Sequence, residues 1–216
     1  GHNAGRQVTT GTANTLIGGL TGDALTSGNS NVAMGYLALS ADTLGDRAVA
    51  IGLNSLATQN FATSTDNFNV GVGYQSGMSI TTGIQNTFIG GNAGDAITDA
   101  DFNVAVGYAA LGSDTLGSNS TAIGWSALAS QNFSTATLSY NTAVGFKAGL
   151  DVTTGEQNTF VGGLAGENVT TGQRNVFLGA FAGDAITEGQ QNTALGRGTL
   201  TSDTLGSRSV AVGTDA

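Results

Sequence analysis

Short apolar strings return along the chain at regular intervals. Each runs from Thr or Val through a middle residue to an aliphatic residue and a glycine, and this alternation over two residues predicts a short β-strand. The closing glycines lie 17 residues apart, except for two spacings of 21, so the chain reads as a stack of repeated coils. We expect one strand of about five residues per coil. The closing glycines are Gly18, Gly35, Gly52, Gly73, Gly90, Gly107, Gly124, Gly145, Gly162, Gly179, Gly196 and Gly213.

Two columns of side chains are expected to face the interior of the coils. One is the residue before each closing glycine, which is aliphatic in every copy; the other, three residues after the glycine, is small, as in Ala38 and Ala110. The middle residue of each string, such as Ala33 or Phe88, would then face outward and pack against sister chains, together with aromatic residues that follow the glycines. The aliphatic column is Ile17, Met34, Ile51, Val72, Ile89, Val106, Ile123, Val144, Val161, Leu178, Leu195 and Val212.

A second glycine and an asparagine also recur once in most coils. The glycine lies ten residues after the closing glycine, as in Gly28 and Gly155, and we expect a turn with positive φ there. The asparagine opens the apolar string, and we expect its side chains to stack as a structural ladder of hydrogen bonds along the axis, with a binding role as the alternative. The ladder consists of Asn14, Asn31, Asn69, Asn86, Asn103, Asn141, Asn158, Asn175 and Asn192.

Four coils together form a longer period of 72 residues, because residues 18–89 align with 90–161 at that offset. The pattern predicts an all-β protein, a parallel β-solenoid or β-roll of about twelve 17-residue coils, two of them lengthened to 21. We expect residues 1–216 to form a single repetitive domain, a segment of a longer fibre. The interior of such a coil is thin, so we expect a trimer that buries a further face.

The composition excludes several classes of function. With 15 acidic and 6 basic residues the net charge is -9, which argues against a nucleic-acid partner. The sequence contains no run of 18 apolar residues, so we expect no insertion into a membrane. The absence of cysteine excludes disulfides. His2 is the only histidine, so neither a zinc site nor a His-dependent triad can be assembled, and no cofactor is expected.

The acidic residues also follow the repeat, which argues against an enzyme. Glycoside hydrolysis needs two carboxylates in one cleft, whereas these aspartates recur in columns as stacking predicts. A calcium site made by three copies of Asp42 or Asp114 around a trimer axis is left as an alternative. The two aspartate columns are Asp23, Asp95 and Asp184, and Asp42, Asp114 and Asp203.

Each of the two 21-residue coils contains a Gln-Asn-Phe sequence followed by a Ser/Thr-rich stretch. The four additional residues must bulge outward, and such bulges often form the binding surface of a solenoid. Phe61 and Phe133 are therefore our expected surface contact residues. The alternative is that each phenylalanine ring lies against the neighbouring coil or chain.

The repeats resemble those of two groups of surface fibres. NTFIGGNAGDAIT at 86–98, NTAVGFKAGLDVTTGEQNTFVGGLAG at 141–166 and NVAVGYAALGSDTLG at 103–117 look like the NTxIGxxAG repeats of bacteriophage tail fibres and large bacterial surface proteins. They are also similar to the head (β-roll) repeats of trimeric autotransporter adhesins. The resemblance implies a homotrimeric, extracellular or virion-borne filament, left-handed in the adhesin heads, that attaches to a glycan or protein receptor and has no enzymatic activity.

Two other functions fit a solenoid of this composition. A monomeric ice- or carbohydrate-binding β-solenoid would display a flat file of regularly spaced threonines, and Thr-Thr pairs such as Thr81-Thr82 do not recur in every coil. A polysaccharide depolymerase would need paired carboxylates in a groove. We therefore expect a structural and adhesive fibre segment in the first place.

Overall fold

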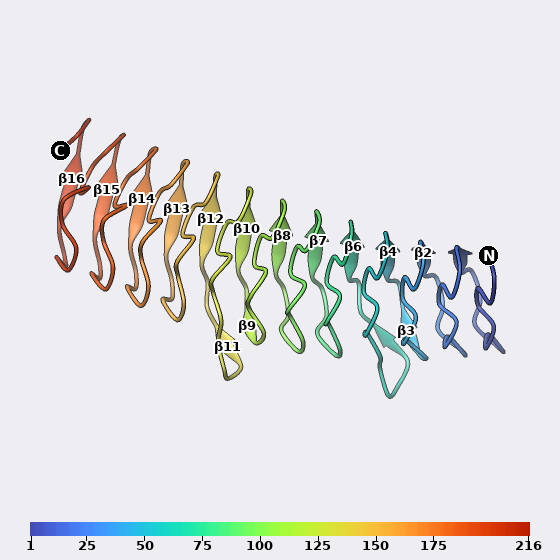
Figure 1. The fold of residues 1–216 in the computed structure, drawn as a ribbon. Coiled ribbons are helices and arrows are strands. Elements are labelled where there is room, and N and C mark those ends of the chain that lie inside the picture. The colour runs from blue at the N-terminus through green and yellow to red at the C-terminus, as the bar shows by residue number, and fades with distance from the viewer.

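The computed structural model describes residues 1–216 as one elongated stack of coils (Figure 1). Each coil contributes one strand to a 12-stranded parallel sheet, which confirms the predicted all-β parallel β-solenoid. The strands contain three residues each, shorter than the expected five. The sheet consists of β1 (Thr15–Ile17), β2 (Val32–Met34), β4 (Val49–Ile51), β6 (Val70–Val72), β7 (Thr87–Ile89), β8 (Val104–Val106), β10 (Thr121–Ile123), β12 (Thr142–Val144), β13 (Thr159–Val161), β14 (Val176–Leu178), β15 (Thr193–Leu195) and β16 (Val210–Val212).

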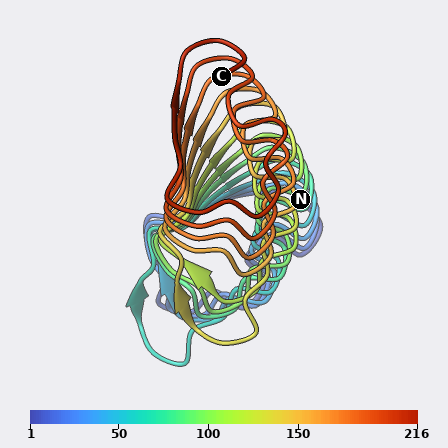
Figure 2. The ribbon, with the colours of Figure 1, turned by 90° about the vertical axis from the view of Figure 1, so that its left-hand side faces the viewer.

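Neighbouring coils are stacked in register. In β7 and β8, Thr87 pairs with Val104 and Ile89 with Val106, one 17-residue repeat further along the chain. Hydrogen bonds between coils continue outside the strands, as from the amide of Gly94 to the carbonyl oxygen of Ala110 at 2.9 Å. The whole outline of a coil is therefore repeated by the next one, as Figure 2 shows along the stack.

The sheet turns the opposite face inward from the one we expected. The middle residues of the strands, such as Ala105 and Phe88, are fully buried, whereas Ile17 and Ile89 before the closing glycines are 53% and 41% exposed. The prediction that the aliphatic column lies inside is wrong. Both columns are apolar, and it is the middle residue that packs in the narrow interior, together with the small side chains three residues after the glycine such as Ala110.

The middle residue and the residue four positions after the closing glycine complement each other in volume. Phe88 is combined with Gly94, where an added Cβ would lie 2.5 Å from the phenyl ring, and Ala105 is combined with Leu111. Two coils break the rule, because Gly71 is combined with Gly77 and Ala143 with Gly149; the space beside Gly77 and Gly149 is taken by the phenylalanine and leucine side chains of the adjacent coils. The complementary pairs are Leu16/Gly22, Ala33/Leu39, Ala50/Leu56, Phe88/Gly94, Ala105/Leu111, Ala122/Leu128, Phe160/Gly166, Phe177/Gly183 and Ala194/Leu200.

The second glycine column serves a different purpose from the one we predicted. Gly28 and Gly155 do not have positive φ, so that expectation is wrong. A Cβ at Gly28 would instead lie 2.4 Å from the carbonyl oxygen of Gly45 in the next coil, so the close approach of two backbones requires glycine. Positive φ occurs at the closing glycines, for example 134° at Gly90.

The two 21-residue coils bulge outward on the same side of the rod (Figures 1 and 2). At the first bulge β3 (Gly45–Asp46) pairs with β5 (Thr65–Asp66), and at the second β9 (Gly117–Ser118) pairs with β11 (Thr137–Leu138). Each bulge thus folds back onto the turn of the preceding coil. No helix in the structure has the length and apolar character needed to cross a membrane.

Candidate interaction surface and internal ladders

The structure places the nine expected asparagines in one column, all of them fully buried except Asn14. The Asn158 amide Nδ2 donates to the carbonyl oxygen of Gly172 at 2.8 Å, while its Oδ1 accepts from the backbone N–H of Asn175 at 3.0 Å. One side chain therefore satisfies two backbone groups of the following coil. The same pair of bonds is made by the other eight asparagines of the column, Asn14, Asn31, Asn69, Asn86, Asn103, Asn141, Asn175 and Asn192.

In the two coils that lack this asparagine, residues of the bulges make hydrogen bonds in its place. Ala48 takes the asparagine position before the first bulge, and there Asn67 supplies the missing acceptor: its Oδ1 accepts from the N–H of Asn69 at 2.9 Å. Ser120 takes the position before the second bulge, with its Oγ 2.5 Å from the Oγ of Ser139. The loss of the asparagine and the insertion of four residues therefore occur together in both places, and the inserted segment supplies polar groups that the ladder lacks there.

Buried carboxylates replace apolar core residues beside each bulge. Asp42 accepts from the N–H of Gly45 at 2.9 Å and from Nε2 of Gln59 at 2.6 Å, and burial raises the pKa of this carboxyl group. Asp114 and Gln131 form the same pair, hydrogen-bonded at 2.5 Å. Both aspartates are fully buried inside their own coil, so the alternative of a calcium site shared between chains is wrong.

No cluster of three or more His, Asp or Glu side chains is arranged to hold a metal ion. Burial also raises the pKa of Asp184, which lies in the column of Asp23 and Asp95. These carboxylates remain separated along the stack and do not face one another across a common groove.

Phe61 and Phe133, the expected contact residues, are only 5% and 4% exposed. The ring of Phe133 lies over Gly117, where an added Cβ would be 2.7 Å from it, and the hydroxyl of Thr115 donates to the carbonyl oxygen of Phe133 at 2.9 Å. The prediction that these rings form a contact surface is wrong, because each ring covers the polar Asp–Gln pair beneath the bulge. The alternative, a ring against the neighbouring coil, holds.

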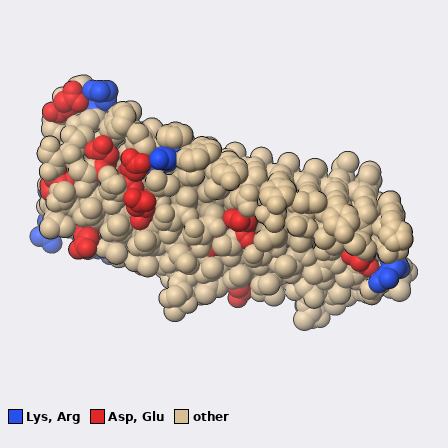
Figure 3. Space-filling model, viewed as in Figure 1, with Lys and Arg blue, Asp and Glu red and all other residues tan.

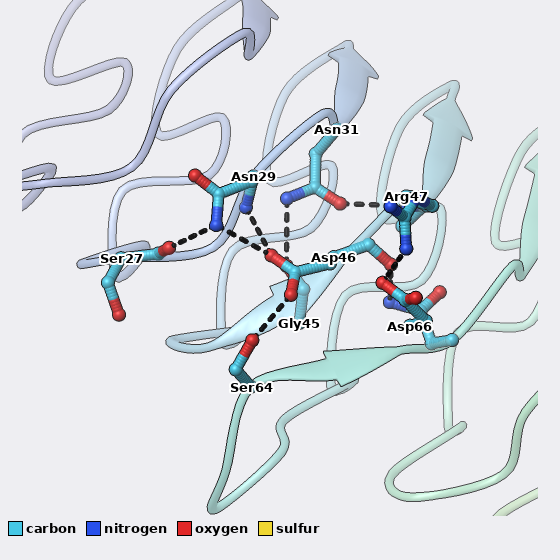
Figure 4. Close-up of polar contacts among 10 residues, drawn as sticks. Ser27, Asn29, Asn31, Gly45, Asp46, Arg47, Ser64 and Asp66 are labelled. Carbon is cyan, nitrogen blue, oxygen red and sulfur yellow. Dashed lines mark hydrogen bonds and ion pairs between the residues drawn. The ribbon is translucent and has the colours of Figure 1, made fainter.

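The first bulge carries a polar cluster of its own (Figure 4). Asp46, 7% exposed, accepts from the backbone N–H of Asn29 at 2.5 Å, from Nδ2 of Asn29 at 3.1 Å and from Oγ of Ser64 at 2.6 Å. Arg47 forms an exposed ion pair with Asp66. The cluster fixes the first bulge on the coil before it, and the second bulge has Ser118, Asn119 and Leu138 at the matching positions.

A second ladder was missed by the sequence analysis. Eight residues after the closing glycine, every 17-residue coil has a threonine, and the hydroxyl of Thr98 donates to the carbonyl oxygen of Thr115 in the next coil at 3.1 Å. Counting from the closing glycine would have found this column. Its hydroxyl protons are used along the rod, as in Thr9, Thr26, Thr81, Thr98, Thr153, Thr170 and Thr187.

The outward face of the sheet carries two columns: the first residue of each strand, which is threonine or valine, as in Thr87 and Val104, and an aliphatic residue before each closing glycine. We call the column before the closing glycines the aliphatic row; it runs the length of the sheet, and its exposed members include Ile17, Met34, Ile89, Ile123 and Leu195. Few charged residues lie over the middle of the rod in the view of Figure 3. Monomeric soluble proteins rarely expose a continuous apolar surface of this kind, which marks it as a candidate interaction surface.

Beside the aliphatic row runs a second exposed column, directly after the closing glycines. We call it the aromatic stripe. Within it Trp125 stacks on Tyr108 and on Phe146, with ring centroids 6.3 and 5.2 Å apart, and Nζ of Lys147 lies 5.8 Å from the Trp125 centroid. The exposed large apolar members of the stripe are Tyr36, Leu53, Tyr74, Tyr108, Trp125 and Phe146.

The comparisons with known proteins bear on both bulged regions. Neither the search of curated proteins nor that of solved structures found a match. The family described as YadA head domain repeat matches the chain twice, at residues 44–64 and 116–137. Both segments contain a bulge and begin 72 residues apart, at 44 and 116. The expected resemblance to the head repeats of trimeric autotransporter adhesins is thus confirmed over these two segments, and the chain is similar to them there.

Proposed function

We propose that this chain is a structural and adhesive rod of the adhesin type, carried on a cell surface, and that three copies assemble along the aliphatic row. The observation that supports the proposal is the continuous aliphatic row on the outer face of the 12-stranded sheet. Its side chains are already about half buried, so burying the remainder would contribute about 1 kcal/mol for each aliphatic residue. Repeated along the stack, this contribution can offset the entropy lost on association.

The shape of the surface favours a parallel, symmetric assembly. The aliphatic row offers one residue per coil, and copies related by a rotation axis parallel to the rod would bring the same row of each chain to the axis. The similarity to YadA head repeats supports a trimer and a place at the cell surface. In this function the stacked coils act as a stiff support, and the outer side chains attach to a receptor.

Light scattering after size exclusion tests the assembly. A mass of about three times 21.4 kDa is the expected result. Ile89→Asp would place a charge in the aliphatic row and is expected to give the single-chain mass with the circular dichroism of the native protein. Leu138→Asp is the matched control, because Leu138 is 56% exposed on the bulge strand β11, and it should remain trimeric.

A folded wild-type protein with the mass of one chain would refute the trimer. That result would favour the second candidate, a monomeric solenoid that binds ice or carbohydrate through its outer face. Placement on a virion, as a segment of a phage tail fibre, would require the same rod on phage particles, and antibody labelling of phage and cells distinguishes the two locations.

A further inference from the structure

The aromatic stripe is interrupted by glycines at 72-residue intervals, at Gly19, Gly91 and Gly163. The fold does not require glycine at the last two. Neither has a left-handed φ; a Cβ at Gly91 would make an ordinary contact of 3.5 Å with Tyr108, and one at Gly163 would meet nothing within 4 Å. These glycines affect the shape of the surface, because each leaves a gap in the aromatic stripe where most other coils have a side chain.

Only the gap at Gly91 has a tyrosine on both sides, since Gly19 lies between His2 and Tyr36, and Gly163 between Phe146 and Ala180. Tyr74 and Tyr108, 53% and 55% exposed, occupy the same position in the coils before and after it. Backbone bonds fix this order, from the N–H of Asn92 to the oxygen of Tyr74 at 2.8 Å and from the N–H of Ala109 to the oxygen of Gly91 at 3.0 Å. Because neighbouring strands are about 4.8 Å apart, the two rings start from backbones roughly 9.6 Å apart.

A backbone separation of about 9.6 Å leaves room between the two rings for a puckered ring as well as for a flat one. A planar ligand in contact with both walls would need about 7–8 Å between them, two contacts of about 3.5–4.0 Å each. A pyranose chair is thicker, and its C–H groups can contact both aromatic faces. At Gly91 the floor of the notch is backbone, and the Tyr108 ring leans toward it, with Cδ2 3.5 Å from the place where a Cβ of residue 91 would lie.

Polar groups lie along one edge of the notch. Nδ2 of Asn92 donates to Oε1 of Gln75 at 3.3 Å and to Oδ2 of Asp95 at 3.0 Å. These bonds orient the three side chains and leave Oδ1 of Asn92, Nε2 of Gln75 and Oδ1 of Asp95 available to hydroxyl groups. An aromatic wall with amide and carboxylate groups at its edge suits a sugar, which is apolar on its faces and polar around its rim.

We infer that the Gly91 notch, walled by Tyr74 and Tyr108, binds a neutral pyranose whose substituents are all equatorial, such as a β-glucosyl unit. In this stereochemistry every axial position carries hydrogen, so both faces of the ring present C–H groups with no axial hydroxyl between them and the aromatic walls. The net charge of -9 and the nearby Asp95 disfavour sulfated and sialylated glycans. The inference deepens the proposed adhesive function by naming the class of receptor, and rests on that function for its biological meaning.

Saturation-transfer NMR on the full chain with methyl β-D-glucopyranoside tests the notch. Saturation should reach the axial protons of both faces, and methyl α-D-mannopyranoside, with its axial hydroxyl, should bind at least several-fold more weakly. Gly91→Leu and Tyr108→Ala are expected to lower the affinity at least tenfold. The matched controls are Gly163→Leu and Tyr36→Ala, each 72 residues from its counterpart, and both should bind as the wild type does.

Two results would overturn the inference. One is the absence of saturation of the glucoside at millimolar concentration; the other is equal binding by Gly91→Leu and Gly163→Leu. The mass of each variant separates this inference from the proposed assembly. A single-chain mass with intact sugar binding refutes only the trimer, whereas a change of mass in Gly91→Leu alone would assign the notch to the contact between chains and refute the sugar site.

Discussion

Replacing Asn158 by alanine tests the asparagine ladder at the middle of an unbroken run. The substitution removes the donor to the oxygen of Gly172 and the acceptor for the N–H of Asn175, two bonds of 2.8 and 3.0 Å in a fully buried column. Each backbone group left without a partner costs about 1–3 kcal/mol, so Asn158→Ala should lower the free energy of unfolding by roughly 2–6 kcal/mol. In a stack of repeats this loss falls on the interface between two neighbouring coils.

Urea unfolding followed by circular dichroism measures the total loss, and amide hydrogen exchange locates it. The amide of Asn175 should exchange much faster in the variant, while amides several coils away keep their protection. Asn168→Ala is the control, since its exposed Nδ2 donates to the oxygen of Asp184 at 2.6 Å and its loss should cost below about 1 kcal/mol. Asn158→Ala with control-like stability and an unchanged Asn175 amide would show that the ladder contributes little.

Three further predictions concern the core and the turns. Phe88→Ala should cost about 3–5 kcal/mol, and Phe88→Ala with Gly94→Leu should regain part of it by adopting the alanine–leucine combination of other coils, as thermal unfolding of the three proteins would show. Gln59→Leu should cost about 1–3 kcal/mol by removing the Nε2 donor to the buried Asp42 carboxylate, which keeps its bond from the N–H of Gly45, and Asp42→Leu with Gln59→Ile should regain at least half. Because burial raises the pKa of Asp42, the loss of unfolding free energy in Gln59→Leu should be largest above that pKa, where the carboxyl group is ionised, and should shrink as the pH falls through it. Urea unfolding at several pH values measures this loss, and a loss that grew in acid would show that Gln59 does not stabilise the ionised carboxylate. Gly107→Ala should prevent stacking of its coil, since φ is 132° and a Cβ would lie 2.4 Å from the oxygen of Gly124; a native circular dichroism spectrum and melting curve would refute this.

The period, the parallel stacking and the number of coils could be predicted from the sequence, because spacing alone determines them. The face that turns inward could not. Ala105 and Val106 are both apolar, so alternation over two residues does not tell the core side from the outer side. The pairing of side-chain volumes does identify the inner face. One coil combines the large Phe88 with Gly94, and the next combines the small Ala105 with Leu111; only side chains that share one interior need complementary volumes.

The candidate site was predicted less well. Phe61 and Phe133 were chosen as large apolar residues in a projecting loop, but the polar Asp–Gln pair beneath each bulge needs a cover and the ring provides it. The positive φ values of Leu39 and Leu56, 54° and 48°, have no signal in residue type. The glycine gap at Gly91 is visible in the sequence, yet its lack of any backbone requirement appears only when the space around it is known.

The stacking bonds have a mechanical consequence for a rod held at both ends. The strand, threonine and asparagine bonds all join one coil to the next, so tension along the axis loads them coil by coil. When one 17-residue coil detaches, the chain lengthens by its extended length of about 58 Å less the lost step of about 4.8 Å. Stretching a single molecule should therefore give a sawtooth with steps of roughly 50 Å and longer steps at the two 21-residue coils. An attachment built this way extends under a sudden load because single coils unfold, and it shortens again when the load falls and the coils refold.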